Sequence, residues 1–462
     1  MKPLLKKMEW TATSNPREEQ ILECTPGLTS RIPPGSLLSG IQGIQKSDWC
    51  VVGFRFTVKR AESAALSSDP HFHETLTVTD LKHAEAKASA TGNQEFLLTP
   101  GPLTTSLTVK QAVLRDWGSR DPQFIRLNAR VRERLVEIAG GTGEFTCVPV
   151  QGSGTFAVEA AVGTLLPRDG KLLVLVNGAY GERIVKIAKY LGRASLAQRC
   201  PEDQVPNLDL LEQTLKDDAA ITHVVAIHCE TTSGILNPLE QIARIVAKQK
   251  RSLIIDAMSA FGALPLDVQA LPCDAVVASS NKCLEGIPGM GYAIIRATVL
   301  ADCEGNSHSL SLDLYEQWRA LEGNGQWRFT PPTHVLAAFD QALAEHEAEG
   351  GVSGRSARYS ENCRVLVEGM RNLGFQSLLP DKLQAPIIVT FLIPDDPAFV
   401  FSEFYDRLAT RGYLIYPGKL TVADTFRIGC IGQMTPDVLS DTLIVIGETL
   451  ATMGVRNCAP AK

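Results

Sequence analysis

The 462-residue sequence lacks any apolar run near the roughly 20 residues that a membrane-spanning helix needs. Its longest apolar runs, such as Leu172–Val176 and Leu443–Ile446, are short. A basic surplus is also missing, because 45 lysines and arginines stand against 51 aspartates and glutamates. The formal net charge of -6 disfavours nucleic acid or an anionic membrane as a partner. These absences indicate an ordinary globular protein, long enough for about two or three domains.

Paired cysteines are missing as well. The 11 cysteines form no CxxC motif and no cluster with histidine, so we expect reduced thiols and no metal site. The basic start (Lys2, Lys6 and Lys7) is not followed by the apolar core of a signal peptide, and nearby glutamates disfavour a mitochondrial transit peptide. We therefore expect a cytoplasmic protein, with a mitochondrial location as the alternative.

The character of the sequence changes near residue 94. Residues 1–94 are rich in Ser, Thr, Gly and Pro and lack repeating strand or helix patterns, so we predict a loosely ordered extension without assigned chemistry. From Phe96 onward, short apolar runs typical of buried strands alternate with helical segments. The predicted strands are Leu172–Val176, His223–His228, Leu253–Asp256, Ala275–Ser279 and Tyr292–Ile295, and the predicted helices between them are Glu182–Leu191, Asp209–Leu215 and Leu239–Lys250. This alternation predicts an α/β fold, a mainly parallel sheet covered by helices on both faces, over residues 95–335.

Residues 336–462 have a different pattern. Two long helices are expected first, Val335–Glu347 and Ala357–Leu373. They are followed by strands near Pro386–Leu392 and Phe426–Ile431 and by helices near Phe401–Thr410 and Pro436–Met453. We therefore predict connecting helices and a small carboxy-terminal α+β domain. Ligands of parallel α/β sheets bind beyond the carboxyl ends of the strands, and chemistry is expected there.

A Gln-Gly-Ser-Gly-Thr segment over residues 151–155 precedes the helix-like run Phe156–Leu166. Small residues allow backbone N–H groups to approach an anion, and a helix start adds partial positive charge. Ser153 and Thr155 add hydroxyl donors around Gly154, so the segment is a candidate phosphate site. It is neither a Walker loop nor a full GxGxxG motif, and a glycine turn at a helix start is commonly only loop punctuation.

Two strand ends carry charged residues. Asp256 ends the predicted strand Leu253–Asp256. It could cap the next turn, or it could stand beside a cationic ring nitrogen and keep that nitrogen protonated. Lys282 follows the strand Ala275–Ser279 and precedes a Gly-Ile-Pro-Gly turn, a position that suits covalent attachment of a carbonyl compound, although most lysines are solvated surface charges. The order of anion loop, strand-end acid and strand-end lysine favours the functional interpretation.

Arg427 lies between Phe426 and Ile428 in a predicted strand of the small domain. An arginine between apolar residues is unusual on an ordinary surface. It could belong to a buried salt bridge, or it could hold a carboxylate or phosphonate with its planar guanidinium.

Nine segments of the chain carry a family resemblance. They are, in order, LLTPGPLTTS from Leu97, QGSGTFAVEA from Gln151, NGAYGER from Asn177, HCETTSGILNPL from His228, IIDAMSAFG from Ile254, SSNKCLEGIPG from Ser279, SLSLDLYEQW from Ser309, WRFTPPTH from Trp327 and FRIGCIG from Phe426. From about Phe96 to Met453 the chain resembles the 2-aminoethylphosphonate–pyruvate transaminases, which belong to class V of the fold type I pyridoxal-phosphate (PLP) enzymes. The resemblance implies a large domain with a seven-stranded type of sheet and PLP as the cofactor.

The resemblance also implies roles for individual residues. Lys282 would carry the cofactor covalently, and Asp256 would hold its ring nitrogen. The other expected cofactor contacts come from Ser153, Gly154, Thr155, Tyr180, Thr231, Met258 and Asn281. Thr330 would reach the cofactor phosphate from the partner subunit of a homodimer with a shared active site. Arg427 would bind the carboxylate of pyruvate and the phosphonate of the amine substrate.

Three other functions stay open on the sequence alone. The chain could be another class V aminotransferase, such as an alanine–glyoxylate or serine–pyruvate enzyme. It could be a PLP-dependent lyase of the cysteine desulfurase or kynureninase type, although no mobile-loop cysteine is apparent. It could also be a cofactor-free binding protein, which the presence of Lys282, Asp256 and Arg427 disfavours.

Overall fold

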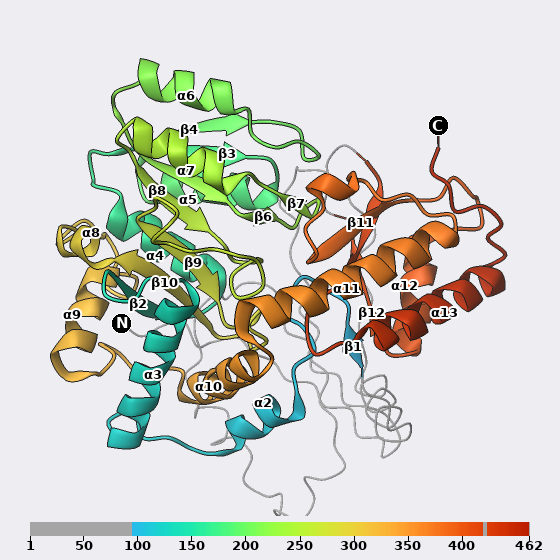
Figure 1. Ribbon diagram of the computed structural model, residues 1–462, viewed down its shortest axis with the longest axis horizontal. Helices are drawn as coiled ribbons and strands as arrows, with labels where there is room; N and C mark the ends of the chain where they lie inside the picture. The colour runs from blue at the N-terminus through green and yellow to red at the C-terminus, as the bar shows by residue number, and fades with distance from the viewer. Residues whose placement is uncertain (1–94, 419–422, 462) are drawn as a thin grey trace, which may run out of the picture. The chain divides into compact units, whose positions relative to one another are not determined.

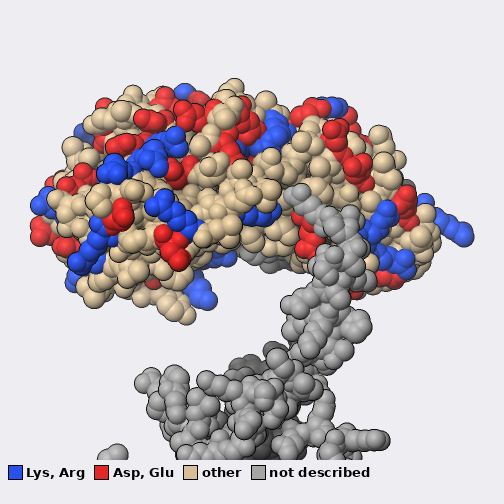
Figure 2. All heavy atoms as spheres, turned by 90° about the horizontal axis from the view of Figure 1, so that it is seen from below, with Lys and Arg blue, Asp and Glu red and all other residues tan. Residues whose placement is uncertain are grey.

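The computed structural model describes residues 95–418 and 423–461 of the chain (Figure 1). The predicted extension over residues 1–94 lies outside the described residues. Acidic and basic side chains are intermixed over the described surface that Figure 2 shows, in keeping with the near balance of charge in the sequence. No helix in the described part is long and apolar enough to cross a membrane.

A seven-stranded sheet, in the order β2-β10-β9-β8-β5-β3-β4, forms the centre of the larger part. Its strands are β2 (Phe145–Gln151), β3 (Lys171–Val176), β4 (Ala194–Arg199), β5 (Ile221–Ile227), β8 (Ser252–Asp256), β9 (Ala275–Ser279) and β10 (Met290–Arg296). Neighbouring strands pair in parallel except β10, which is antiparallel to both β2 and β9. The predicted mainly parallel α/β sheet is confirmed.

Helices cover both faces of this sheet because its inner strands are apolar on both sides. Leu173 and Leu175 of β3 belong to one buried cluster, while Leu172, Val174 and Val176 belong to the other. The first cluster contains residues of α3 (Pro122–Ile138), α6 (Leu208–Asp217), α7 (Leu239–Lys248) and α10 (Thr333–Ala348). The second contains residues of α4 (Gly154–Leu165), α5 (Ala179–Tyr190), α8 (Ala297–Ala301) and α9 (Leu314–Asn324). The alternation of side chains along each strand thus produces two cores on one sheet.

The smaller, carboxy-terminal part has its own sheet and core. β11 (Ile388–Leu392), β14 (Thr425–Gly429) and β13 (Tyr416–Pro417) pair antiparallel. Side chains of α11 (Gly351–Asn372), α12 (Phe401–Thr410) and α13 (Pro436–Met453) pack on them, with Phe426 among several aromatic rings. Figure 1 shows α11 running between the two sheets. β1 (Phe96–Leu97) pairs in parallel with β12 (Tyr413–Leu414), so the first described residues lie against this carboxy-terminal part.

Short elements complete the described chain. They are α2 (Leu107–Gln111) with the 3-10 turn Ala112–Leu114, the hairpin of β6 (Cys229–Glu230) and β7 (Ile235–Leu236), and the 3-10 turn Asp381–Leu383. The hairpin directly follows β5 and carries residues of the candidate site described below.

Candidate active site

A cavity of about 210 Å³ lies where β8 and β9 end and α4 begins. Its wall consists of Gly101, Ser153, Gly154, Thr155, Val158, Tyr180, Arg183, Ile184, Asp256, Met258, Ser279, Asn281 and Lys282. Eight of the eleven residues predicted from the sequence are among them. The cavity lies at the carboxyl ends of parallel strands, the place where such sheets bind their ligands.

Lys282 extends from the turn after β9 into this wall. Its Nζ donates hydrogen bonds to the carbonyl oxygens of Pro100, at 2.7 Å, and Gly101, at 3.4 Å. A Cβ at Gly101 would lie 2.6 Å from Cδ of Lys282, so only glycine leaves room for the lysine there. Burial lowers the pKa of Lys282, against the opposing effect of Tyr180 and Asp256. A lowered pKa favours the neutral amine, which is the nucleophilic form.

Asp256 is the last residue of β8 and is 5% exposed. Its Oδ1 accepts a hydrogen bond from the backbone N–H of Met258 at 3.0 Å. Burial raises the pKa of Asp256 to about 6, although that hydrogen bond and the nearby Arg183 and Lys282 lower it. A cation placed beside this buried carboxyl group would stabilise its charged form.

The start of α4 has the features of an anion cradle. Ser153 is the N-cap residue, and its side chain makes no capping hydrogen bond. A Cβ at Gly154 would lie 2.2 Å from Sδ of Met258, so a larger residue there would displace the Met258 side chain. Thr155 accepts a hydrogen bond from Nη1 of Arg183 at 3.2 Å. Backbone donors, hydroxyls and a guanidinium therefore converge at one helix start.

Arg183 and Glu230 are site residues that the sequence interpretation missed. Arg183 lines the cavity, and its guanidinium carbon lies 4.8 Å from the centre of the Tyr180 ring. It stands three residues after Tyr180 in the NGAYGER segment, so helical spacing could have indicated a shared face.

Glu230 is fully buried in β6, and its carboxylate accepts hydrogen bonds from Thr232 and from the backbone N–H groups of Tyr180 and Gly181. Burial raises the pKa of Glu230, and the four hydrogen bonds oppose that shift. The carboxylate thereby fixes the start of α5 and the position of Tyr180. A charged residue directly after an apolar strand was the available signal.

Thr231 and Arg427 meet beside the cavity but are not in its wall. Nη1 of Arg427 donates to the carbonyl oxygen of Thr231 at 2.9 Å, and Nε donates to that of Pro417 at 3.1 Å. Arg427 is 5% exposed, and burial lowers its pKa. The hydroxyl of Thr231 is buried without a hydrogen-bond partner, which is unusual unless a ligand supplies one.

Thr330 lies apart from these residues. It is exposed, in the segment between α9 and α10, and it is not in the cavity wall of its own chain. Within the described ranges, no three His, Cys, Asp or Glu side chains are grouped so that they could hold a metal ion.

The model of the family "Aminotransferase class-V" matches residues 105–396. The chain belongs to this family. This class-V aminotransferase is 54% identical over 368 residues to "2-aminoethylphosphonate--pyruvate transaminase 1" of Paraburkholderia xenovorans, a match that covers 79% of this chain and 95% of the relative. It is 52% identical over 363 residues to "2-aminoethylphosphonate--pyruvate transaminase" of Pseudomonas putida (strain W619), a match that covers 79% of this chain and 99% of the relative.

Solved structures of aminotransferases share the fold of this class-V chain. Pyridoxamine-pyruvate aminotransferase from Mesorhizobium loti superposes with a TM-score of 0.72 at 23% identity, covering 79% of this chain and 94% of that one. Aspartate aminotransferase from Thermus thermophilus has a TM-score of 0.71 at 22% identity, covering 78% and 100%. These likenesses confirm the fold type I architecture.

Pyridoxal phosphate is the cofactor of this class-V aminotransferase, and the cavity fits it. The cradle at α4 suits a phosphate, the carboxylate of Asp256 suits a pyridinium nitrogen, and the amine of Lys282 suits an aldehyde. The hydroxyl of Ser279, in the cavity wall, is buried and has no hydrogen-bond partner in the described chain, and the same holds for the hydroxyl of Thr231 beside the cavity.

Replacing Asp256 with Asn should stabilise the cofactor-free protein at alkaline pH. The folded state holds the Asp256 proton more tightly than the unfolded chain, since the pKa is about 6 rather than 3.8. Stability therefore falls as the pH rises through this window, and the penalty, at most about 3 kcal/mol, is fully present above it. We expect urea denaturation to show a higher free energy of unfolding for D256N at pH 8 and a difference that shrinks towards pH 5.

The control for this experiment is Asp203→Asn, at an exposed loop position. Its effect should be small and should not change with pH in the same way. A D256N protein that is less stable than the wild type at pH 8 would contradict the raised pKa.

Proposed function

We propose that this enzyme transfers the amino group of 2-aminoethylphosphonate to pyruvate, giving phosphonoacetaldehyde and L-alanine. The observation that carries the proposal is the cavity in which Lys282, Asp256 and the cradle at Ser153 converge. The relatives at 52–54% identity bear the name of this reaction. Most of their length is covered, so the comparison extends over the whole site.

Lys282 is proposed as the catalytic base and acid. Bound PLP supplies an electron sink for the carbon that bears the amino group. Nζ of Lys282 removes a proton from that carbon as the base and gives a proton back as the acid in the same half-reaction, which a buried amine of lowered pKa is suited to do. Its hydrogen bonds to Pro100 and Gly101 keep Nζ at the cavity wall. The two half-reactions use the same lysine in opposite directions.

The remaining cavity residues are proposed to hold the cofactor. Asp256 keeps the ring nitrogen protonated, and Tyr180 packs against the ring. Ser153, Gly154 and Thr155 bind the phosphate at the start of α4, assisted by Arg183 through its hydrogen bond to Thr155. The other proposed contacts are made by Thr231, Met258 and Asn281.

Arg427 is proposed to bind the acidic group of both substrates. Two of its donors are fixed on Thr231 and Pro417, so the guanidinium is oriented before a substrate arrives. Burial strengthens its attraction for an anion because little water screens the charge. A carboxylate and a phosphonate both present oxygen pairs that match the planar fork of arginine.

A homodimer with shared active sites is part of the proposal. Thr330 is exposed and outside its own cavity wall, as a residue that serves the partner's cofactor phosphate would be. We also propose a cytoplasmic location, in keeping with the nine free cysteines of the described chain.

An assay with purified enzyme tests the reaction. We expect alanine to form from 2-aminoethylphosphonate and pyruvate, and we expect Lys282→Ala to reduce its formation by more than about a thousandfold. Serine and alanine as amino donors, with glyoxylate as acceptor, test the other class V activities. Borohydride reduction and peptide mapping should place the pyridoxyl group on Lys282. An adduct on another lysine, or a clear preference for another donor, would contradict the proposal.

Replacing Arg427 with Lys should raise the KM for pyruvate and for 2-aminoethylphosphonate. Lysine keeps the charge but loses the planar two-point contact, so each KM should rise roughly tenfold or more. Steady-state kinetics with each substrate varied in turn measure the effect. The matched control is Arg407→Lys, whose side chain pairs with Glu403 on the exposed face of α12. Unchanged KM values in R427K would remove Arg427 from the substrate site.

Subunit complementation tests the shared site. Thr330→Glu should repel the cofactor phosphate, and Lys282→Ala lacks the catalytic amine, so each homodimer should be inactive. A mixed dimer of the two variants contains one site with neither change and should recover about half of the wild-type turnover per dimer. Isolation of the mixed dimer through two different tags permits the measurement. An inactive mixed dimer, or full activity of T330E alone, would contradict a site shared through Thr330.

A further inference from the structure

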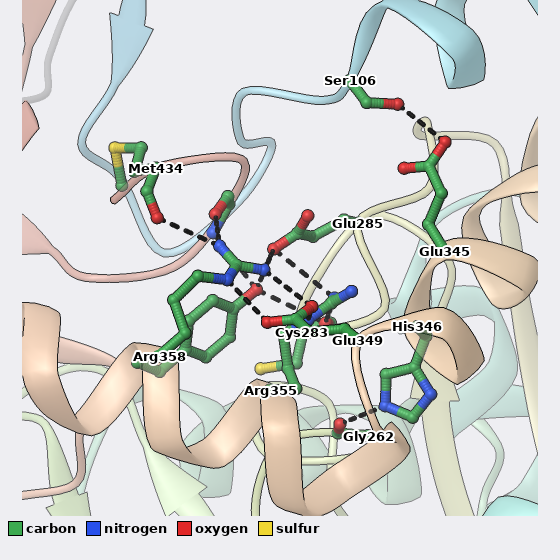
Figure 3. Close-up of polar contacts among 12 residues, drawn as sticks. Ser106, Gly262, Cys283, Glu285, Glu345, His346, Glu349, Arg355, Arg358 and Met434 are labelled. Carbon is green, nitrogen blue, oxygen red and sulfur yellow. Dashed lines mark hydrogen bonds and ion pairs between the residues drawn. The ribbon is translucent and has the colours of Figure 1, made fainter. Parts of the chain in front are cut away.

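Figure 3 shows a group of charged side chains that contacts Cys283 and Glu285, in the turn that follows Lys282 in the chain. We call Glu285, Glu349, Arg355, Arg358 and Tyr359 the buried ion cluster. Arg355 is 1% exposed, Glu285 2% and Tyr359 0%. Two carboxylates stand against two guanidinium groups, so the cluster is formally neutral. None of these five residues is in the wall of the cofactor cavity.

One side of the cluster contacts the turn that carries Lys282. Nη1 of Arg355 donates to the carbonyl oxygen of Cys283 at 2.5 Å, and Nε contacts Glu349 at 2.6 Å. The backbone N–H of Glu285 donates to the carbonyl oxygen of Lys282 at 2.8 Å. Glu285 has a φ of 57°, in the left-handed region that a non-glycine residue adopts only when its surroundings hold it there.

The other side of the cluster contacts the loop after β14, the strand that carries Arg427. Nη1 of Arg358 donates to the carbonyl oxygens of Gly432, at 2.5 Å, and Met434, at 3.1 Å. The hydroxyl of Tyr359 accepts from the backbone N–H of Gly432 at 3.2 Å and donates to Glu285 at 2.5 Å. Arg358 also contacts Glu285 at 2.8 Å and Glu349 at 2.6 Å. The cluster therefore joins the Lys282 turn to the loop that ends the Arg427 strand.

Stability alone is a poor explanation for such a cluster. Arg355 and Glu285 are taken out of water, which costs several kcal/mol each, while the side chains of Arg358 and Glu349 stay 18% and 23% exposed. Apolar residues of the same volume commonly stabilise a core as well as buried ions do, or better. Hydrogen-bonded ions differ from apolar contacts in fixing both distance and direction. The two arginines of the cluster donate hydrogen bonds to backbone carbonyl oxygens of the Lys282 turn and of the loop after β14. The geometry of the cluster therefore determines the backbone position of both segments.

We propose that the buried ion cluster is a positioning device that sets the catalytic Lys282 against the substrate-binding Arg427. Arg355 and Glu285 hold the lysine turn, and Arg358 and Tyr359 hold the end of the arginine strand. The roles of Lys282 and Arg427 themselves rest on the function proposed above. A misplacement of about 1 Å at a reacting group can reduce a rate by about a hundredfold, so a small shift of either segment is enough to be measured.

Two conservative variants separate the two sides of the cluster. Arg355→Lys keeps the charge but loses the fixed contact with Cys283, so kcat per bound cofactor should fall about tenfold while the KM for pyruvate stays within about twofold. Arg358→Lys loosens the loop at Gly432 and Met434, so the KM for pyruvate should rise about fivefold. The matched control is Arg364→Lys on the same helix, where the arginine is exposed and pairs with Glu361 and Glu368. The control should retain both constants.

A third variant guards against loss of folding. Tyr359→Phe keeps every charge and removes only the hydroxyl between Glu285 and Gly432, and it should reproduce a smaller version of both effects. Thermal midpoints of all variants report stability separately. Lower midpoints combined with wild-type kcat and KM in the folded, cofactor-loaded fraction would overturn the proposal, because the cluster would then serve stability only.

A substrate-independent measurement separates this proposal from the proposed reaction. The visible absorbance of lysine-bound PLP follows the rate at which added cofactor becomes attached to Lys282. R355K should attach PLP about tenfold more slowly than the wild type and R364K, whichever amine is the natural donor. Equal attachment rates would contradict the placement of Lys282 by Arg355. An enzyme that fails to use 2-aminoethylphosphonate, yet shows the slow attachment in R355K, would refute the proposed reaction and leave the positioning role standing.

Discussion

The site depends on the removal of one lysine amine from water. Lys282 is enclosed between the end of β9 and the Pro100-Gly101 segment, and this burial lowers the pKa of its amine. A solvated lysine would stay protonated and would neither attack a carbonyl nor accept a proton at neutral pH. The glycine at position 101 makes the enclosure possible because any side chain there would occupy the space of the lysine. The fold supplies the enclosure by bringing residues near position 100 to the carboxyl ends of strands that lie much later in the chain.

The central sheet was predictable because its strands are buried on both faces. The continuous apolar run Ala275–Ser279 is a strand with the predicted bounds. The helices Phe401–Thr410 and Pro436–Met453 also have the predicted bounds. The prediction missed the two edge strands of the sheet, β2 and β4. The Ala-Ser-Leu-Ala-Gln-Arg sequence of β4 is largely exposed and has no apolar run. It also began α11 at Ala357, six residues late; the stretch before Ala357 contains Gly350, Gly351 and Gly354, and glycine has a low helix propensity. In the structure Gly350 is the N-cap, and the helix starts at Gly351.

The candidate site was predictable where chemistry coincides with a strand end. Asp256, Lys282 and the glycine-rich start of α4 are found from local pattern and family resemblance together, and the structure places them around one cavity. Glu230 and the buried ion cluster could not be found in this way. The role of these residues depends on partners that are distant in the sequence; Arg358, for example, donates hydrogen bonds to Glu285 and Gly432. A single sequence shows charged residues on a helix such as α11, and only the fold shows which of them are removed from water.

The balance of charge around the cavity explains why the site suits anions. Arg183 and Arg427 supply positive charge, while Asp256 and Glu230 supply negative charge. Both carboxylates are buried, and their mutual repulsion contributes to the raised pKa of Asp256.

The two carboxylates differ in how their charge is compensated. Glu230 accepts hydrogen bonds from backbone N–H groups of α5, so fixed dipoles compensate its charge locally. Asp256 has only one backbone donor and depends on a cation for the rest of its compensation. In the proposed function Asp256 pairs with the pyridinium nitrogen, which leaves the guanidinium groups of Arg183 and Arg427 for anionic groups. A phosphate at the start of α4 and a carboxylate or phosphonate near Thr231 are the anions that the two positions fit.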